Sequence, residues 1–237
     1  MKFTTHALTL LMFLGIGGPA AACVTDAECN DNSVCTGTET CQAGVCIPGT
    51  PLTCTDTDPC TVNGCNALTG CTFTPTDACT VPGHRLKMGS RGVDLRITVQ
   101  TDGSIKGTAF PPNGGASDPV INGASIRILT EVGDQFDATH PMPAAGWSYV
   151  GDGYVYRDKA AVHGPIKFAL VRNGHPTKIK GGGTLGFNIA DDPNPVQLVI
   201  QFGTGKKYCL AFGGLVKFQP GRGYHALRAP APAQCPS

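Results

Sequence analysis

Between Cys23 and Gly83 the sequence contains no lysine, arginine or histidine, and its apolar side chains are few and scattered. Such a segment buries too little apolar surface to fold as an independent small domain through a hydrophobic core alone. We therefore expect disulfide bonds to hold this module together. It contains ten cysteines: Cys23, Cys29, Cys35, Cys41, Cys46, Cys54, Cys60, Cys65, Cys71 and Cys79.

The cysteines also lack the spacing of metal and redox sites. No Cys-x-x-Cys pair occurs, which argues against zinc ribbons, haem attachment and thioredoxin-like chemistry. We predict no metal and no cofactor, with one alternative left open. The polar residues between the cysteines could coordinate calcium, although Asp and Asn also form tight turns with their own backbone; these residues are Asp26, Asn30, Asp31, Asn32, Asp56 and Asp58.

The cysteine spacing indicates an imperfect internal repeat. Successive cysteines are separated by 5, 5, 5, 4 and 7 residues up to Cys54, and then by 5, 4, 5 and 7 residues up to Cys79. The run from Cys54 to Thr61, followed by Cys65 and Gly70-Cys71, resembles the Cys-Thr-Asp repeats of large extracellular matrix and cell-surface proteins. This resemblance implies a structural or adhesive module without catalytic residues.

The N-terminus has the order of a secretory signal peptide, which we assign to residues 1–22. Lys2 precedes an apolar run over residues 7–16, and Ala20-Ala21-Ala22 supplies the small residues of a cleavage site. The run is shorter than the roughly 20 residues that span a bilayer, so we expect no transmembrane span. We predict a secreted bacterial protein, extracellular or at the cell surface, with the periplasm also open. A lipid anchor on Cys23 is an alternative, but it would leave an odd number of cysteines to pair.

Charge divides the chain into two modules. From Cys23 to Gly83 there are seven acidic residues and no basic ones, whereas from His84 onward there are 17 basic and 10 acidic residues. We place the domain boundary at this change, giving residues 23–83 and 84–237. The asymmetry indicates association: the two modules contact each other, molecules pair head to tail, or the basic module binds an anionic glycan or cell-surface polymer. We expect no nucleic acid partner, and the oligomeric state stays open.

The second module alternates apolar and polar residues with the period of half-buried strands. This pattern and its turn dipeptides predict an all-β fold, an antiparallel β-sandwich or barrel. We expect a bridge between Cys209 and Cys235 to fix the C-terminal tail. The segment from Tyr208 to Gly214, with the tail from Ala229 to Pro236, resembles the C-terminal domain of a group of secreted bacterial proteins, which implies no activity. Strands are expected at residues 93–99, 105–110, 124–130, 147–150, 154–156, 166–171, 196–202, 207–212 and 215–218.

No motif in the chain predicts an enzyme. Gly146-Trp147-Ser148 begins like a nucleophile elbow but lacks its final glycine, and Asp191-Asp192 lies before a proline as in a turn. We therefore predict a non-catalytic structural or adhesive protein. The alternative is a carbohydrate-binding module that stacks sugar rings on one aromatic hairpin, unless those rings fill the core or form a cross-strand ladder; its residues are Trp147, Tyr149, Tyr154 and Tyr156.

Overall fold

The computed structural model describes residues 22–237 except 57, 92–93, 102–110, 112 and 174, and it describes no side chains for residues 90–97. The predicted signal peptide up to residue 21, the turn expected at Asp102-Gly103 and the strand expected at 105–110 lie outside the described residues. Contacts divide the chain into unit 1, Met1–Cys54 and Asn63–Thr72, and unit 2, Thr55–Val62 and Phe73–Ser237. No helix in the described part of the chain is long and apolar enough to cross a membrane.

Unit 1 is held by disulfides, as the sequence predicts. It contains η1 (Asp26–Glu28), the hairpin of β1 (Thr40–Gln42) and β2 (Val45–Ile47), and parts of the hairpin of β3 (Thr61–Asn66) and β4 (Gly70–Pro75). Among its described residues, only Cys23 and Gly70 are buried. Four bridges replace the missing core: Cys23–Cys41, Cys29–Cys46, Cys35–Cys65 and Cys54–Cys71.

The internal repeat appears in the structure as two equivalent turns. The carboxylate of Asp31 accepts a hydrogen bond from the Thr36 hydroxyl at 3.0 Å, and that of Asp56 accepts one from the Thr61 hydroxyl at 2.8 Å. Each carboxylate also accepts the backbone N–H two residues further on. These oxygens close Asx turns, which favours the turn interpretation of the acidic residues over calcium binding.

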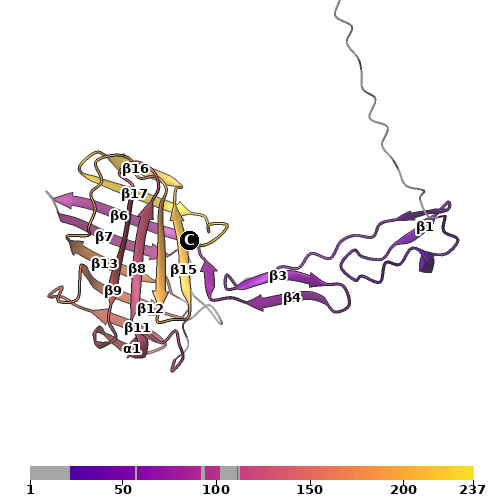
Figure 1. The fold of residues 1–237 in the computed structure, drawn as a ribbon, viewed down its shortest axis with the longest axis horizontal. Coiled ribbons are helices and arrows are strands. Elements are labelled where there is room, and N and C mark those ends of the chain that lie inside the picture. Colours follow the sequence, from indigo (N-terminus) through magenta and orange to yellow (C-terminus); the bar gives the residue numbers. More distant parts are fainter. Residues whose placement is uncertain (1–21, 57, 92–93, 102–110, 112, 174) are drawn as a thin grey trace, which may run out of the picture. The chain divides into compact units, whose positions relative to one another are not determined.

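Unit 2 contains two large sheets and little helix (Figure 1). The eight-stranded sheet is antiparallel throughout, in the order β10 (Trp147–Val150), β11 (Gly153–Arg157), β12 (Ile166–Arg172), β13 (Lys178–Gly183), β7 (Asp94–Thr101), β6 (Gly83–Arg91), β17 (Gly223–Ala229) and β16 (Leu215–Gln219). The five-stranded sheet has the order β5 (Ala78–Thr80), β15 (Lys207–Phe212), β14 (Val196–Phe202), β8 (Ala124–Thr130) and β9 (Phe136–Met142). The described helices of unit 2 are the short α1 (Pro119–Asn122) and η3 (Ala144–Gly146).

The two sheets enclose one core. Leu86 and Met88 from the eight-stranded sheet and Ile126 and Leu198 from the five-stranded sheet belong to the same buried cluster. In Figure 1 the strands of one sheet cross those of the other steeply, as in an orthogonal sandwich. The all-β prediction is therefore confirmed. The strands expected at 124–130, 147–150, 196–202 and 207–212 have the observed bounds of β8, β10, β14 and β15.

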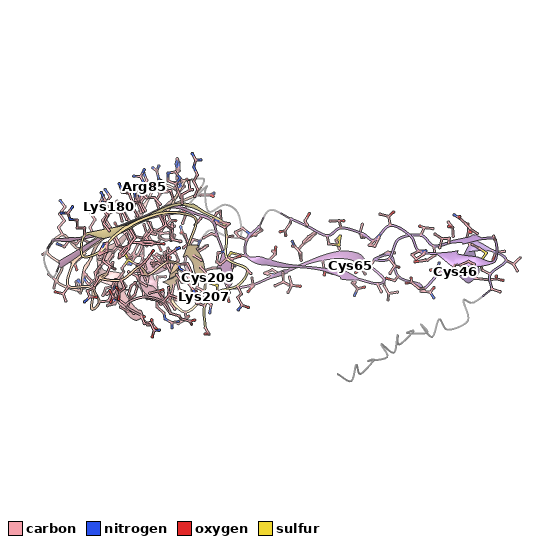
Figure 2. All side chains as sticks on the ribbon, turned by 90° about the horizontal axis from the view of Figure 1, so that it is seen from above. Cys46, Cys65, Arg85, Lys180, Lys207 and Cys209 are labelled. Atoms are coloured by element: carbon pink, nitrogen blue, oxygen red, sulfur yellow. A yellow bond between two sulfur atoms is a disulfide. The ribbon has the colours of Figure 1, made fainter. Side chains whose placement is uncertain are left out.

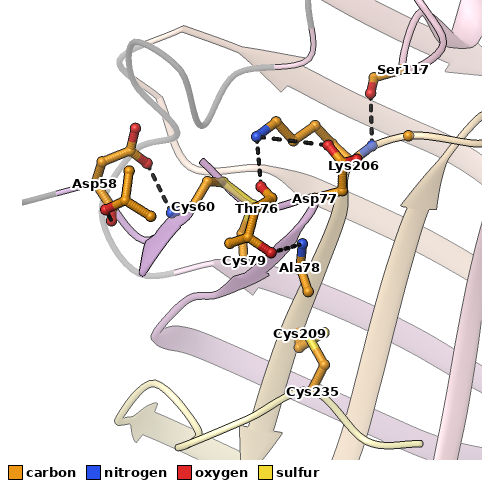
Figure 3. The surroundings of a disulfide bond; sticks show 12 residues. Asp58, Cys60, Thr76, Asp77, Ala78, Cys79, Ser117, Lys206, Cys209 and Cys235 are labelled. Atoms are coloured by element: carbon orange, nitrogen blue, oxygen red, sulfur yellow. Dashed lines mark hydrogen bonds and ion pairs between the residues drawn. A yellow bond between two sulfur atoms is a disulfide. The ribbon is translucent and has the colours of Figure 1, made fainter. Parts of the chain in front are cut away.

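β5 attaches residues upstream of the sandwich to its five-stranded sheet (Figure 3). It pairs in parallel with β15, so that Ala78 lies opposite Lys207 and Thr80 opposite Cys209. Cys79, in the middle of β5, forms a fully buried disulfide with Cys60. The predicted Cys209–Cys235 bridge is also present. The strand pairing and the disulfide together make β5 an edge strand of the sandwich. The domain boundary predicted at residue 83 stays a prediction.

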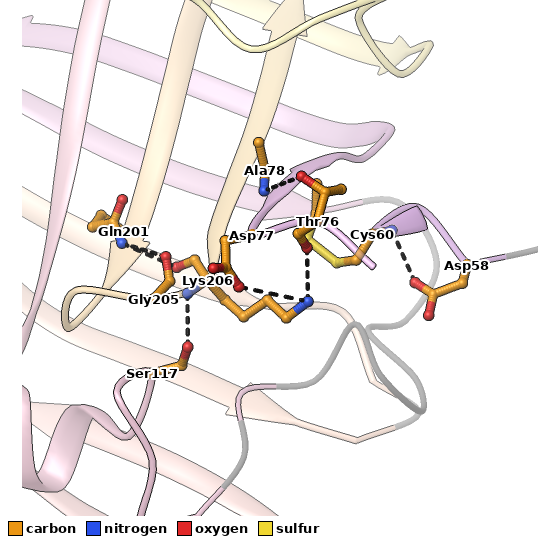
Figure 4. Close-up of polar contacts among 10 residues, drawn as sticks. Asp58, Cys60, Thr76, Asp77, Ala78, Ser117, Gln201, Gly205 and Lys206 are labelled. Carbon is orange, nitrogen blue, oxygen red and sulfur yellow. Dashed lines mark hydrogen bonds and ion pairs between the residues drawn. A yellow bond between two sulfur atoms is a disulfide. The ribbon is translucent and has the colours of Figure 1, made fainter. Parts of the chain in front are cut away.

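Polar contacts from Lys206 strengthen the attachment of β5 (Figure 4). Its Nζ donates a hydrogen bond to the Thr76 carbonyl at 2.8 Å and lies 4.0 Å from the Asp77 carboxylate. Its backbone N–H donates to Ser117 Oγ at 2.7 Å. One residue therefore links the segment before β5 to the loop before α1.

Candidate functional site

Positive charge is concentrated in the eight-stranded sheet. Its strands contain one acidic residue, Asp94, and eleven basic residues: Arg85, Lys87, Arg91, Arg96, Arg157, Lys167, Arg172, Lys178, Lys180, Lys217 and Arg228. The strands of the five-stranded sheet contain only Arg127, Lys207 and Asp137, and Arg127 forms an ion pair with Asp137 at 2.6 Å. The basic character of the second module therefore belongs to one sheet.

Strand alternation places the described basic side chains of β6 and β13 on the outer face of that sheet. Leu86 and Ile179 are buried in the core, whereas their neighbours Arg85, Lys87 and Lys180 are exposed. Successive side chains of a strand point to opposite faces, so these cations lie on the face away from the core. Figure 2 shows Arg85 and Lys180 extending from the same side of the sheet.

The strand register aligns these cations across the sheet. Lys217 of β16 lies opposite His225 of β17, which lies opposite Lys87 of β6, which lies opposite Thr98 of β7, which lies opposite Lys180 of β13. We call these five residues the basic row. Neighbouring strands are about 4.8 Å apart, so the three lysines, on alternate strands, follow one another at intervals of about 10 Å.

A parallel row adds two further cations. Arg85 and Lys178 lie opposite Gln100 from its two sides, two residues along each strand from the basic row and therefore on the same face. Both side chains are exposed. The face therefore carries two lines of positive charge.

No acidic partner neutralises these cations within the described part of the chain. The ion pairs found there involve Arg127, His163 and Lys206, and none includes a residue of the basic row, Arg85 or Lys178. The pKa of His225 is lowered from its usual value by burial and by the positive charges of Arg85, Lys87 and Lys217. The effect on His225 shows that the positive potential acts within the row itself.

The aromatic hairpin lies mainly in the core. Trp147 faces Tyr156 across β10 and β11 with ring centroids 5.4 Å apart, and Tyr149 faces Tyr154 at 5.7 Å. Trp147, Tyr154 and Tyr156 are buried, and the Trp147 indole N–H donates to the Met142 carbonyl at 3.0 Å. Tyr149 is 50 % exposed, but its hydroxyl donates to Asp118. This geometry favours the core and cross-strand-ladder interpretation over a flat platform for sugars.

The cysteine sulfur atoms are all in disulfides. Those of Cys23, Cys29 and Cys41 lie within 4.8 Å of one another, close enough for a metal site. The Cys23–Cys41 and Cys29–Cys46 bridges, however, leave no thiolate there to act as a ligand. All twelve cysteines are paired, and six disulfides indicate an oxidising environment outside the cytoplasm.

The sequence indicates the charge of the second module but not the basic row. Alternation in β6 alone separates Arg85 and Lys87 from Leu86 and Met88, which is a usable signal. The alignment of Lys217 and Lys180 with Lys87 depends on pairing between strands far apart in the chain. Comparison of the chain with family models, curated proteins and solved structures gives no match.

Proposed function

We propose that the protein is a secreted, non-catalytic protein of structural or adhesive type that binds an acidic polysaccharide through the outer face of its eight-stranded sheet. The observation that carries the proposal is the basic row, in which Lys217, Lys87 and Lys180 are exposed and have no described acidic partner. A face of one sign of charge raises the local concentration of a ligand of the opposite sign.

The spacing of the cations supports an acidic glycan over a nucleic acid. Lysines about 10 Å apart along the row match a polymer with one charge per disaccharide. Each strand of a nucleic acid carries one charge per roughly 3.4 Å of duplex axis, a much denser pattern. The described part of the chain also offers no helix long enough to read a groove, since α1 has only four residues.

The remainder of the chain is consistent with an extracellular binding role. Residues 23–83 carry seven acidic and no basic residues, so they repel an acidic polymer and leave the basic face as the binding side. The resemblance of residues 54–61 to Cys-Thr-Asp repeats implies a structural or adhesive module. The disulfides that hold unit 1 suit a protein exposed to an oxidising environment.

The test compares two double variants with the same change in net charge. Lys87→Gln/Lys180→Gln removes two lysines of the basic row, whereas Lys159→Gln/Lys207→Gln removes two lysines outside it. Binding of hyaluronan, which carries one carboxylate per disaccharide, and of the more densely charged dextran sulfate is measured against ionic strength by calorimetry. Exposed charge pairs contribute about 0.2–1 kcal/mol each, so removing two of them should weaken binding by roughly twofold to thirtyfold in the first variant, with a shallower salt dependence.

The control variant should bind like the wild type. Equal losses in both variants would show that net charge alone attracts the polymer, and binding that ignores salt would contradict an electrostatic partner. Tighter binding to duplex DNA than to either glycan would replace the proposed ligand by a nucleic acid.

A further inference from the structure

The outer face has a hollow beside the basic row. It has a volume of about 140 Å³ and is lined by residues of β6, β16, β17 and the β16–β17 turn, among them Lys87, Lys217, Arg222 and His225. Gly89 and Gly223 lie directly opposite each other, on the same face as Lys87 and His225 because they are two residues away from them. Since neither glycine has a side chain, the space next to the cations stays open.

His225 is the central residue of this cationic group. It lies between Lys217 of β16 and Lys87 of β6 in the strand register. Its Nε2 is buried and has no hydrogen-bond partner among the described residues. The charged groups that act on it are Arg85 and Lys87 from β6 and Lys217 from β16, all positive, and Arg222 lines the same hollow from the turn.

We infer that this hollow binds one sulfate or carboxylate group of the polymer and that His225 takes up one proton as the group binds. The inference rests on the proposed function and deepens it by naming the subsite and its coupling to pH. The proton comes from the buffer and forms an N–H bond on the imidazole ring, so that the bound anion meets a cationic His225 between two lysines.

The reason is the sign of the charges around the ring. In the free protein, burial and three cations lower the pKa of His225, which keeps the ring neutral near pH 7. A bound anion opposes those cations and favours the protonated ring. By linkage, affinity must then increase as the pH falls, by at most about tenfold for each unit by which binding raises the pKa.

The experiment measures proton uptake directly. Dextran sulfate, whose sulfate groups do not titrate in this range, is bound to the wild-type protein at pH 6.5 by calorimetry in buffers of different ionisation enthalpy. We expect net proton uptake by the wild type, and a roughly threefold to tenfold gain in affinity between pH 7.5 and pH 5.5. His225→Gln should lose most of this uptake and bind with a flatter pH profile. His175→Gln, which changes an exposed histidine outside the hollow, should behave as the wild type.

Two further measurements keep the test decisive. Gly89→Leu places a side chain in the hollow while keeping every lysine, since a Cβ at Gly89 has as its nearest atom the Arg222 carbonyl oxygen at 3.8 Å, and it should reduce the uptake. An NMR titration of His225 in the wild type, with and without dextran sulfate, should show a higher pKa in the complex. Salt-sensitive binding with equal proton uptake in the wild type and His225→Gln would overturn this inference alone. Absence of salt-sensitive binding by the wild type at every pH would overturn the proposed function as well.

Discussion

Removal of the Cys60–Cys79 disulfide is expected to destabilise the sandwich, although Cys60 lies in the cysteine-rich module. The bridge joins the segment before β3 to β5, and β5 is an edge strand of the five-stranded sheet. Both cysteines are fully buried and belong to the core cluster. The double variant Cys60→Ala/Cys79→Ala therefore releases a tether from the sandwich itself.

The size of the effect follows from the loop that the bridge closes. The two cysteines are 19 residues apart, for which the chain-entropy model gives about 3 kcal/mol. In a domain of this size, each kcal/mol lowers Tm by roughly 2–4 °C. We therefore expect the Tm of unit 2 to fall by roughly 6–12 °C, since loss of the buried sulfur atoms can only add to the entropic cost.

The chain supplies its own probe and its own control. Trp147 is the only tryptophan and is buried in the sandwich, so its fluorescence reports the unfolding of unit 2. The control variant is Cys54→Ala/Cys71→Ala, which removes a bridge of similar separation, 17 residues, within unit 1. This variant should leave the fluorescence Tm within a few degrees of the wild type. A fall of equal size in both variants, or an unchanged Tm in Cys60→Ala/Cys79→Ala, would refute the role assigned to β5.

Two further predictions concern unit 2. Burial alone would raise the pKa of Asp118. The net effect is a lowered pKa, because its carboxylate accepts hydrogen bonds from Gly114, Tyr149 and Val120. The charged form thus stabilises the fold above the unfolded pKa near 3.8, and this stabilisation is lost as the pH falls through the lower folded value. Urea denaturation should show Asp118→Asn less stable by about 1–2 kcal/mol at pH 7, with a smaller difference at pH 3; a constant difference would contradict this. Trp147→Ala should lower the free energy of unfolding by about 3–5 kcal/mol, measured by circular dichroism. A stable variant that had lost glycan binding would instead support the hypothesis of an aromatic platform for sugars.

Local patterns in the sequence predict the strands that have strong alternation. Val196–Phe202 alternates apolar and polar residues and forms β14 with its predicted bounds. Five strands of unit 2 lie outside the expected ranges: β5, β6, β9, β13 and β17. In three of them the local sequence weakens the strand signal. β9 contains His140 and Pro141, β13 ends in three glycines, and β17 begins with glycine and contains His225. Cross-strand pairing decides these segments, and a single strand's sequence does not record its partners.

The candidate site shows the same limit. The sequence alone shows that residues 84–237 are basic, because net charge can be counted without knowing the order of the strands. The basic row requires the order β16, β17, β6, β7 and β13, in which the last two strands of the chain lie beside the first strands of the eight-stranded sheet. In the aromatic hairpin, local sequence predicts the strands that form β10 and β11. The burial of Tyr154 and Tyr156 depends on packing against other parts of the sandwich, which the hairpin's own sequence does not record.

The disulfide pairing explains why charge and contacts divide the chain at different places. Cys35 and Cys60 hold equivalent positions in the repeat. Each lies four residues after the aspartate that closes an Asx turn and directly before the threonine that donates a hydrogen bond to that aspartate. Cys35 bonds to Cys65 in the second repeat, whereas Cys60 bonds to Cys79 on β5. The edge of the five-stranded sheet therefore occupies the place that a third repeat would take. The cysteine-rich, acidic composition extends to residue 83. The residues of β5 nevertheless already pack as part of the sandwich.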